Sequence, residues 1–236
     1  MDGVLTDSEP LICDAAMAMF AEKGLLVQPG DFRPFVGTGE ERYFGGVAER
    51  YHFTLDLPAA KERVYEIYLR MVPSRLKAFP GAQALVRKCR SSGLRVALAS
   101  SADEIKIDAN LRQIKLPPQS WDAVVSGEAV KAKKPAPDLF LAAAARLGLG
   151  PRQCVVIEDA INGVMAAKAA GMRCVAVAQT FAAGDLQGAD LVRERIAEVT
   201  LDDLLGPLGK GTALSGGSRA KASGAEPCAE AGKAAP

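Results

Sequence analysis

Short apolar runs alternate with amphipathic stretches through the middle of the chain. The apolar runs are LRVALAS (94–100), WDAVVS (121–126), CVVIED (154–159) and RCVAVA (173–178). They lack the alternation of a half-exposed strand and are rich in Val, Leu and Ala, which is typical of parallel strands buried on both faces. The stretches between them predict helices over 81–92, 103–114, 137–148 and 162–170. Strands and helices in this order predict an α/β fold with a doubly wound parallel sheet.

A different pattern occupies residues 8–78, which contain no convincing strand. Candidate helices run over 8–23, 40–51 and 58–72, and Gly24 stands where the first of them should end. We therefore expect an all-helical domain over 8–78, inserted into an α/β core made of residues 1–7 and 79–208.

The end of the chain, residues 209–236, has a composition of its own. It consists mostly of Ala, Gly and Ser, has no aromatic residue, and contains only Leu214 and Cys228 as candidates for burial. Such a segment cannot offset the entropy cost of ordering, so we expect a disordered tail or an interdomain linker.

Composition narrows the class of protein. The 236 residues carry 29 Lys and Arg against 28 Asp and Glu, a net charge of +1, which argues against a nucleic-acid groove or a polybasic membrane face. No apolar run approaches the length of a membrane span, and MDGVLTDSEP does not read as a signal or transit peptide. Five widely spaced Cys favour free thiols in a reducing compartment over a disulfide framework.

Polar residues follow the predicted strands at their carboxyl ends, where open α/β sheets bind ligands. They are Ser100 and Ser101, Lys134 in KKPAPD, Glu158 and Asp159, together with Asp2 at the chain start. Adjacent carboxylates repel unless a cation compensates, and oxygen ligands suit a hard cation such as Mg2+. The set predicts a three-carboxylate Mg2+ site of Asp2, Glu158 and Asp159, with a hydroxyl and an ammonium placed to clamp phosphate oxygens.

Each of these residues also has a simpler interpretation. Ser100 could cap a helix, Lys134 could be a solvated surface lysine, and the Glu158–Asp159 pair could cap the helix that follows it. Taken singly, Ser100 and Lys134 favour the simpler interpretation, whereas the acidic pair directly after an apolar run favours a site.

Four motifs in order, DGVLTDSE, ALASSA, KPAPDLF and VVIEDAINGV, resemble those of the haloacid dehalogenase-like hydrolases. Within that superfamily the chain resembles the phosphoglucomutase and phosphatase branch, in which a helical cap closes over the site. The resemblance implies an aspartyl-phosphate intermediate and makes Asp2 the general acid/base, whose backbone carbonyl also binds Mg2+. It assigns phosphoryl binding to Ser100 and Ser101, charge stabilisation to Lys134, and the metal to Glu158 and Asp159.

The first motif departs from the family pattern. The nucleophilic Asp belongs two positions before Asp2, at the end of a central strand, and neither the Asp nor that strand is in the sequence as given. Two interpretations stay open: a start placed at an internal Met, which we favour, or a hydrolase that naturally lacks both. We expect little or no phosphotransfer activity from these 236 residues alone.

The cap also departs from the mutase branch. Ile12 stands where that branch has a proton-shuttling His, and Glu40 stands near its phosphate-reading Arg; the only histidine, His52, reads as a surface residue. These changes favour hydrolysis of a small phosphorylated metabolite. The loop Gly37–Thr38–Gly39–Glu40 is the predicted place of substrate contacts, although a plain glycine-rich turn would look the same.

Two other functions compete with a phosphatase. A catalytically silent module for interaction or regulation in a larger chain would also fit the absent nucleophile and the linker-like tail. Dehalogenation would need neither Mg2+ nor Asp2, so the acidic residues argue against it. FVGTGEERYFGGVAERY and SSADEIKIDANL further resemble the stromal hydrolase domain of a multidomain plant chloroplast protein, which implies a stromal location and further domains beyond the linker.

Overall fold

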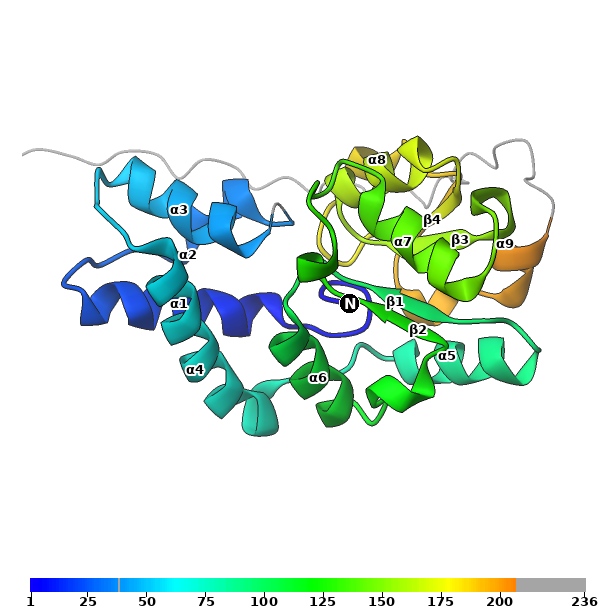
Figure 1. Ribbon diagram of the computed structural model, residues 1–236, viewed down its shortest axis with the longest axis horizontal. Coiled ribbons are helices and arrows are strands. Elements are labelled where there is room, and N and C mark those ends of the chain that lie inside the picture. The colour runs from blue at the N-terminus through cyan, green and yellow to red at the C-terminus, as the bar shows by residue number, and fades with distance from the viewer. Residues whose placement is uncertain (38, 207–236) are drawn as a thin grey trace, which may run out of the picture. The chain divides into compact units, whose positions relative to one another are not determined.

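A computed structural model describes residues 1–37 and 39–206 of the chain (Figure 1). The predicted tail over 209–236 therefore lies outside the described residues. The helices are α1 (Glu9–Glu22), α2 (Pro29–Phe32), α3 (Glu40–Arg50), α4 (Leu57–Arg75), α5 (Ala82–Ser91), α6 (Glu104–Gln113), α7 (Asp138–Leu147), α8 (Ile161–Ala169) and α9 (Leu201–Leu205). The strands are β1 (Ala97–Ala99), β2 (Ala123–Val125), β3 (Val155–Glu158), β4 (Arg173–Val177) and β5 (Leu191–Arg193).

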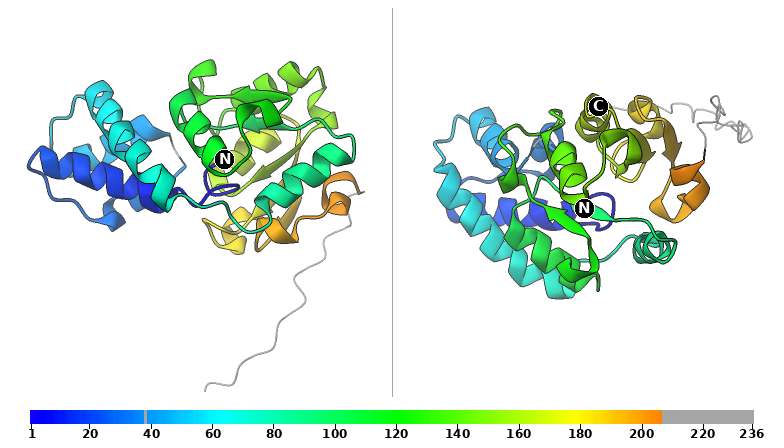
Figure 2. Two further views of the ribbon diagram at one scale, coloured as in Figure 1. Left: turned by 90° about the horizontal axis from the view of Figure 1, so that it is seen from below. Right: turned by 45° about the vertical axis from the view of Figure 1, so that its right-hand side comes forward.

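Helices α1 to α4 pack around a hydrophobic cluster drawn from residues 11–76 alone, with Phe20, Phe44 and Tyr68 fully buried in it. The three helices predicted here are confirmed, and α2 is an additional short one. Helix α4 starts where the Asp56 side chain accepts the backbone N–H of Ala59, a standard N-terminal cap. These helices lie together beside the strand-containing part of the chain (Figure 2). The division into a cap over 8–78 and a core stays a prediction.

The four predicted strands are confirmed, with β5 as an additional short strand. All pairings between them are parallel: β1 pairs with β2, and β4 lies between β3 and β5. Helices cover both faces. Along β4, Val175 and Val177 face a cluster that includes α5 and α6, while Cys174 and Ala176 face one that includes α7 and α8. Strands buried on both faces explain the uninterrupted apolar runs and confirm the doubly wound α/β class.

The strands form two sheets rather than one continuous sheet. Within the described residues, no strand pairs with both β1 and β3. Residues of both strands instead line an apolar cavity of about 250 Å3, with Met1, Trp121 and Phe140 among its other walls. That a further strand belongs in this space stays a prediction. None of the helices described is long and apolar enough to span a membrane.

Candidate active site

A pocket of about 120 Å3 lies at the carboxyl ends of β1 and β3, next to the start of α3. All but one of the predicted site residues line it: Asp2, Gly37, Glu40, Ser100, Ser101, Lys134, Glu158 and Asp159. Thr38 lies outside the described residues. The sheet thus brings together side chains that are more than 150 positions apart in the chain, as expected for the carboxyl edge of parallel strands.

A tight turn at the chain start places Asp2 in the pocket. The backbone N–H groups of Leu5 and Thr6 donate to the Met1 carbonyl at 2.8 and 3.2 Å. Gly3 has a left-handed backbone with φ of +68°, and a side chain there would overlap the Asp159 carboxylate. Only glycine meets both demands without strain.

The Asp2 carboxylate is held by three donors. Ser8 donates its hydroxyl to Oδ1, Asn110 donates its amide at 3.4 Å, and the Lys106 ammonium lies 3.3 Å from Oδ2. Burial on its own would raise the pKa of Asp2, but the positive charge of Lys106 and then the hydrogen bond from Ser8 hold it below the usual value. Asp2 is therefore ionised at neutral pH, as a group that accepts a proton must be.

Lys134 and Glu158 form a buried ion pair, with Nζ 3.0 Å from Oε2. Their side chains are only 10% and 7% exposed, so the solvated-lysine interpretation of Lys134 is wrong. Gly163, in the first turn of α8, lets the helix pass so close that any side chain there would overlap the Glu158 carboxylate. The pair places one positive charge beside the acidic residues that follow β3.

Asp159 is a buried carboxylate directly after β3, next to Glu158. Its carboxylate accepts the Thr180 hydroxyl. Burial, and then the neighbouring Glu158, raise the pKa of Asp159 to about 7. Helix α8 takes Ala160 as its N-cap and no side chain bonds to its first turn, so the acidic pair does not cap this helix.

The oxygen donors of the pocket suit a hard cation only in part. Two adjacent buried carboxylates, one with a strongly raised pKa, fit a divalent ion bound through oxygen. The Asp2 side chain, however, points to Lys106 and Asn110, and among the residues described no three His, Cys, Asp or Glu side chains are grouped as a metal site. The fit rests on Glu158 and Asp159, and the predicted three-carboxylate set stays a prediction.

Ser100 follows β1 and is buried. Its backbone N–H continues the ladder to the Val125 carbonyl at 3.0 Å, and its hydroxyl accepts the backbone N–H of Ala102 at 3.2 Å. Helix α6 takes Asp103 as its N-cap, so the helix-cap interpretation of Ser100 is wrong. A serine hydroxyl that accepts this bond still carries a proton of its own to donate.

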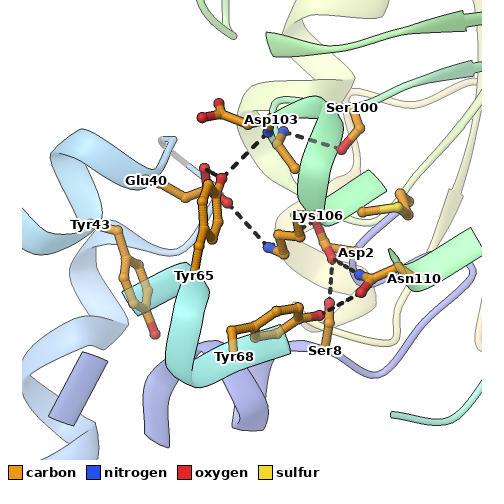
Figure 3. A network of polar contacts seen from close by, with 12 residues as sticks. Asp2, Ser8, Glu40, Tyr43, Tyr65, Tyr68, Ser100, Asp103, Lys106 and Asn110 are labelled. Carbon is orange, nitrogen blue, oxygen red and sulfur yellow. Dashed lines mark hydrogen bonds and ion pairs between the residues drawn. The ribbon is translucent and has the colours of Figure 1, made fainter. Parts of the chain in front are cut away.

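The opposite wall of the pocket comes from α3 and the loop before it (Figure 3). Glu40 lies 3.3 Å from the Lys106 ammonium and accepts the Tyr65 hydroxyl. Burial raises the pKa of Glu40, although Lys106 and then Tyr65 oppose the change. Gly37 and Gly39 have left-handed backbones, which explains the glycines of this loop.

Sequence reasoning missed Lys106, and also Asn110 and Tyr65, which donate to the same carboxylates of Asp2 and Glu40. Figure 3 shows Lys106 between Asp2 and Glu40, so a single ammonium joins the segment before α1 to α3. A signal was present in the sequence: Lys106 and Asn110 lie four residues apart on the same face of α6 as Ile107 and Leu111, the buried face. Polar residues on an apolar helix face require partners.

Ile12 is buried, and His52 is exposed as expected. Neither places an imidazole in the pocket. The pocket offers several hydroxyls, two lysines and several carboxylates, a set suited to binding a phosphoryl group beside a cation and moving a proton at its bridging oxygen.

Comparisons with known proteins agree with this chemistry. The model of haloacid dehalogenase-like hydrolases matches residues 1–171. "Protein SUPPRESSOR OF QUENCHING 1, chloroplastic" from Arabidopsis thaliana is 49% identical over 210 residues, which are 87% of this chain and 20% of that protein. The chain therefore spans about a fifth of that relative's length.

A second relative matches over nearly its whole length: Hexitol phosphatase B of Escherichia coli (strain K12) is 32% identical, covering 87% of this chain and 94% of that protein. Among solved structures, CbbY from Rhodobacter sphaeroides in complex with phosphate has a TM-score of 0.76 at 25% identity, covering 84% of this chain and 92% of that one. The resemblance found in the motifs is confirmed.

Proposed function

Since the chain belongs to the haloacid dehalogenase-like hydrolases, we propose that its pocket is that of a Mg2+-dependent phosphatase acting on a small phosphorylated metabolite. One observation carries the proposal: the pocket joins a hydroxyl, an ammonium and a buried acidic pair around a carboxylate held ionised. Hexitol Phosphatase B and a phosphorylated carbohydrates phosphatase of Thermotoga maritima are among the relatives, which supports a sugar or polyol phosphate as substrate.

Each residue of the pocket has its own role in the proposed phosphatase reaction. Ser100, with Ser101 beside it, donates to phosphoryl oxygens, and Lys134 offsets their charge. Asp2 donates a proton to the leaving oxygen and then takes one from the attacking water, and its ionised state in this structure suits the base half of that role. Glu158 and Asp159 would hold Mg2+, which when bound supplies Lewis-acid polarisation of a phosphoryl oxygen.

Three further assignments belong to the proposal. Residues 8–78 act as a cap that excludes water from the pocket, and Gly37, Thr38 and Glu40 of the cap contact substrate. Residues 209–236 link this domain to others. The "chloroplastic" designation of the Arabidopsis relative supports a chloroplast location, with the stroma as the compartment.

The presence or absence of a nucleophilic Asp decides between the two candidate functions, a phosphatase and a catalytically silent module. The family resemblance places it on an Asp two positions before Asp2, outside the given sequence. The 236-residue polypeptide should therefore bind phosphate esters without turning them over. A polypeptide that carries an apolar segment ending in Asp directly before Met1 should hydrolyse them.

The experiment compares release of inorganic phosphate from a panel of sugar and polyol phosphates by these two polypeptides, each with Mg2+ and with EDTA. The control is the same extension ending in Asn. Turnover only with the Asp extension and Mg2+ supports the phosphatase. Binding without turnover in every form supports the silent module instead, and full activity of the 236 residues alone contradicts the role given to Asp2.

A further inference from the structure

Glu40 at the start of α3 and Lys106 on α6 meet in the pocket that Glu158 and Asp159 also line. The two side chains are 11% and 5% exposed, and their charged atoms are 3.3 Å apart. A substrate bound with its phosphoryl group at the acidic pair would have to fit its remaining atoms into this same pocket of about 120 Å3, which the ion pair also lines. The Glu40–Lys106 pair is therefore placed to contact the leaving group, which is the part of the substrate other than the phosphoryl group.

Both lysines that line the pocket are already paired. Lys134 pairs with Glu158 at 3.0 Å, and Lys106 is shared by Asp2 and Glu40 at 3.3 Å each. Against these two lysines, the described lining residues include five carboxylates: Asp2, Glu9, Glu40, Glu158 and Asp159. A second anionic group on the substrate would find both of these lysines already committed, and like charges brought together in a buried site are unfavourable.

Glu40 cannot easily turn away from an approaching anion. Its carboxylate accepts the Tyr65 hydroxyl, and the oxygen of that hydroxyl also accepts the backbone N–H of Asp103 at 3.4 Å. The nearby Lys61 is committed to Asp103, 2.5 Å away, and offers no alternative positive charge. Glu40 is thus held by Tyr65 on α4 and by Lys106 on α6.

Resting on the phosphatase function proposed above, we propose that the Glu40–Lys106 pair selects phosphate monoesters whose leaving group carries no second anionic group. Carboxylate oxygens of Glu40 and Glu9 can accept hydrogen bonds from hydroxyls, so a polyol or neutral sugar suits this end of the pocket. A bisphosphate or a phosphorylated acid does not. The pair thus acts as a specificity determinant that is separate from the phosphoryl-binding residues.

The test is binding rather than turnover. Calorimetry in the presence of Mg2+ compares glucitol 6-phosphate with glucitol 1,6-bisphosphate on the 236-residue chain. We expect the monophosphate to bind at least about tenfold more tightly, the ratio that one unfavourable charge contact of about 1.4 kcal/mol gives. Glu40→Gln keeps a hydrogen-bond partner for Tyr65 and removes the charge, so the ratio should fall to near one. Glu41→Gln, its exposed neighbour on α3, should leave the ratio unchanged.

Equal or tighter binding of the bisphosphate by the unaltered chain overturns the inference, and this measurement needs no variant to fold. An unchanged ratio in a folded Glu40→Gln chain overturns it as well. If neither ester binds, the proposed phosphatase function fails and the inference falls with it, a result distinct from binding without discrimination.

Discussion

Replacing Asp159 by Asn should stabilise the metal-free protein above neutral pH. The carboxylate is buried next to Glu158, and its pKa is raised to about 7 by that burial and by the neighbouring charge. Asn has nearly the same shape and can still accept the Thr180 hydroxyl, so the substitution removes the charge and little else.

The magnitude follows from linkage between protonation and folding. An acid whose pKa is raised in the folded state keeps its proton there after the unfolded chain has lost it, so stability falls as pH rises from about 4 to about 7 and then levels off. A difference of about three pH units at about 1.4 kcal/mol each corresponds to about 4 kcal/mol, which Asp159 costs the folded protein at pH 8.

The assay is urea unfolding of the metal-free protein at pH 5 and at pH 8. Asp159→Asn should exceed the unaltered chain in unfolding free energy by more at pH 8 than at pH 5, and Mg2+ should raise the stability of the unaltered chain but not of the variant. The exposed Asp185→Asn serves as the matched control. A difference between the two chains that is the same at both pH values would refute the reasoning.

Three further substitutions or treatments test the packing around the site. Gly3→Ala should lower the melting temperature far more than Gly24→Ala. Both glycines have positive φ, which costs Ala about 1–2 kcal/mol at either position, but only at Gly3 would the new methyl group also overlap a carboxylate. Equal losses of melting temperature in the two variants would contradict the steric argument. Tyr68→Phe leaves a buried amide oxygen without its 2.9 Å partner and should reduce the unfolding free energy in urea by about 1–3 kcal/mol. Burial raises the pKa of Cys174 to about 12, so mass spectrometry after brief alkylation at pH 8 should find Cys154 modified and Cys174 intact unless urea is added.

Much of the fold could be predicted because its strands are buried on both faces. Each observed strand from β1 to β4 lies inside a predicted apolar run, since such strands leave a continuous apolar signal. Strand β5, with the sequence LVR, was missed because three half-buried residues followed by charged ones leave no such signal. Whether the strands form one sheet or two depends on which distant segments pair, and the local sequence pattern does not encode that pairing.

The site was predictable where topology alone decides position. Ser100, Lys134, Glu158 and Asp159 follow strands, so parallel order brought them to one edge, and the pocket confirms that they lie together. Lys106 and Tyr65 escaped prediction because their role depends on how α4 and α6 pack against each other. A helix pattern shows which face is buried, and it does not show which distant charge that face meets.

The ammonium group of Lys106 contacts both Asp2 and Glu40 in the pocket. Asp2 stays ionised because Lys106 lies beside it, and Lys106 stays charged in a buried place because Asp2 and Glu40 both face it. Moving α3 outward would leave Lys106 with Asp2 alone and expose Glu40 to water. Such a movement would break the Lys106–Glu40 pair and keep the Lys106–Asp2 pair. Removing the lysine would leave the largely buried Glu40 and the partly exposed Asp2 without their cation, and breaking a buried ion pair by removing one partner typically costs about 3–5 kcal/mol. The contact that Glu40 of α3 makes in the pocket and the ionised state of Asp2 are therefore linked, because the same buried ammonium faces both carboxylates.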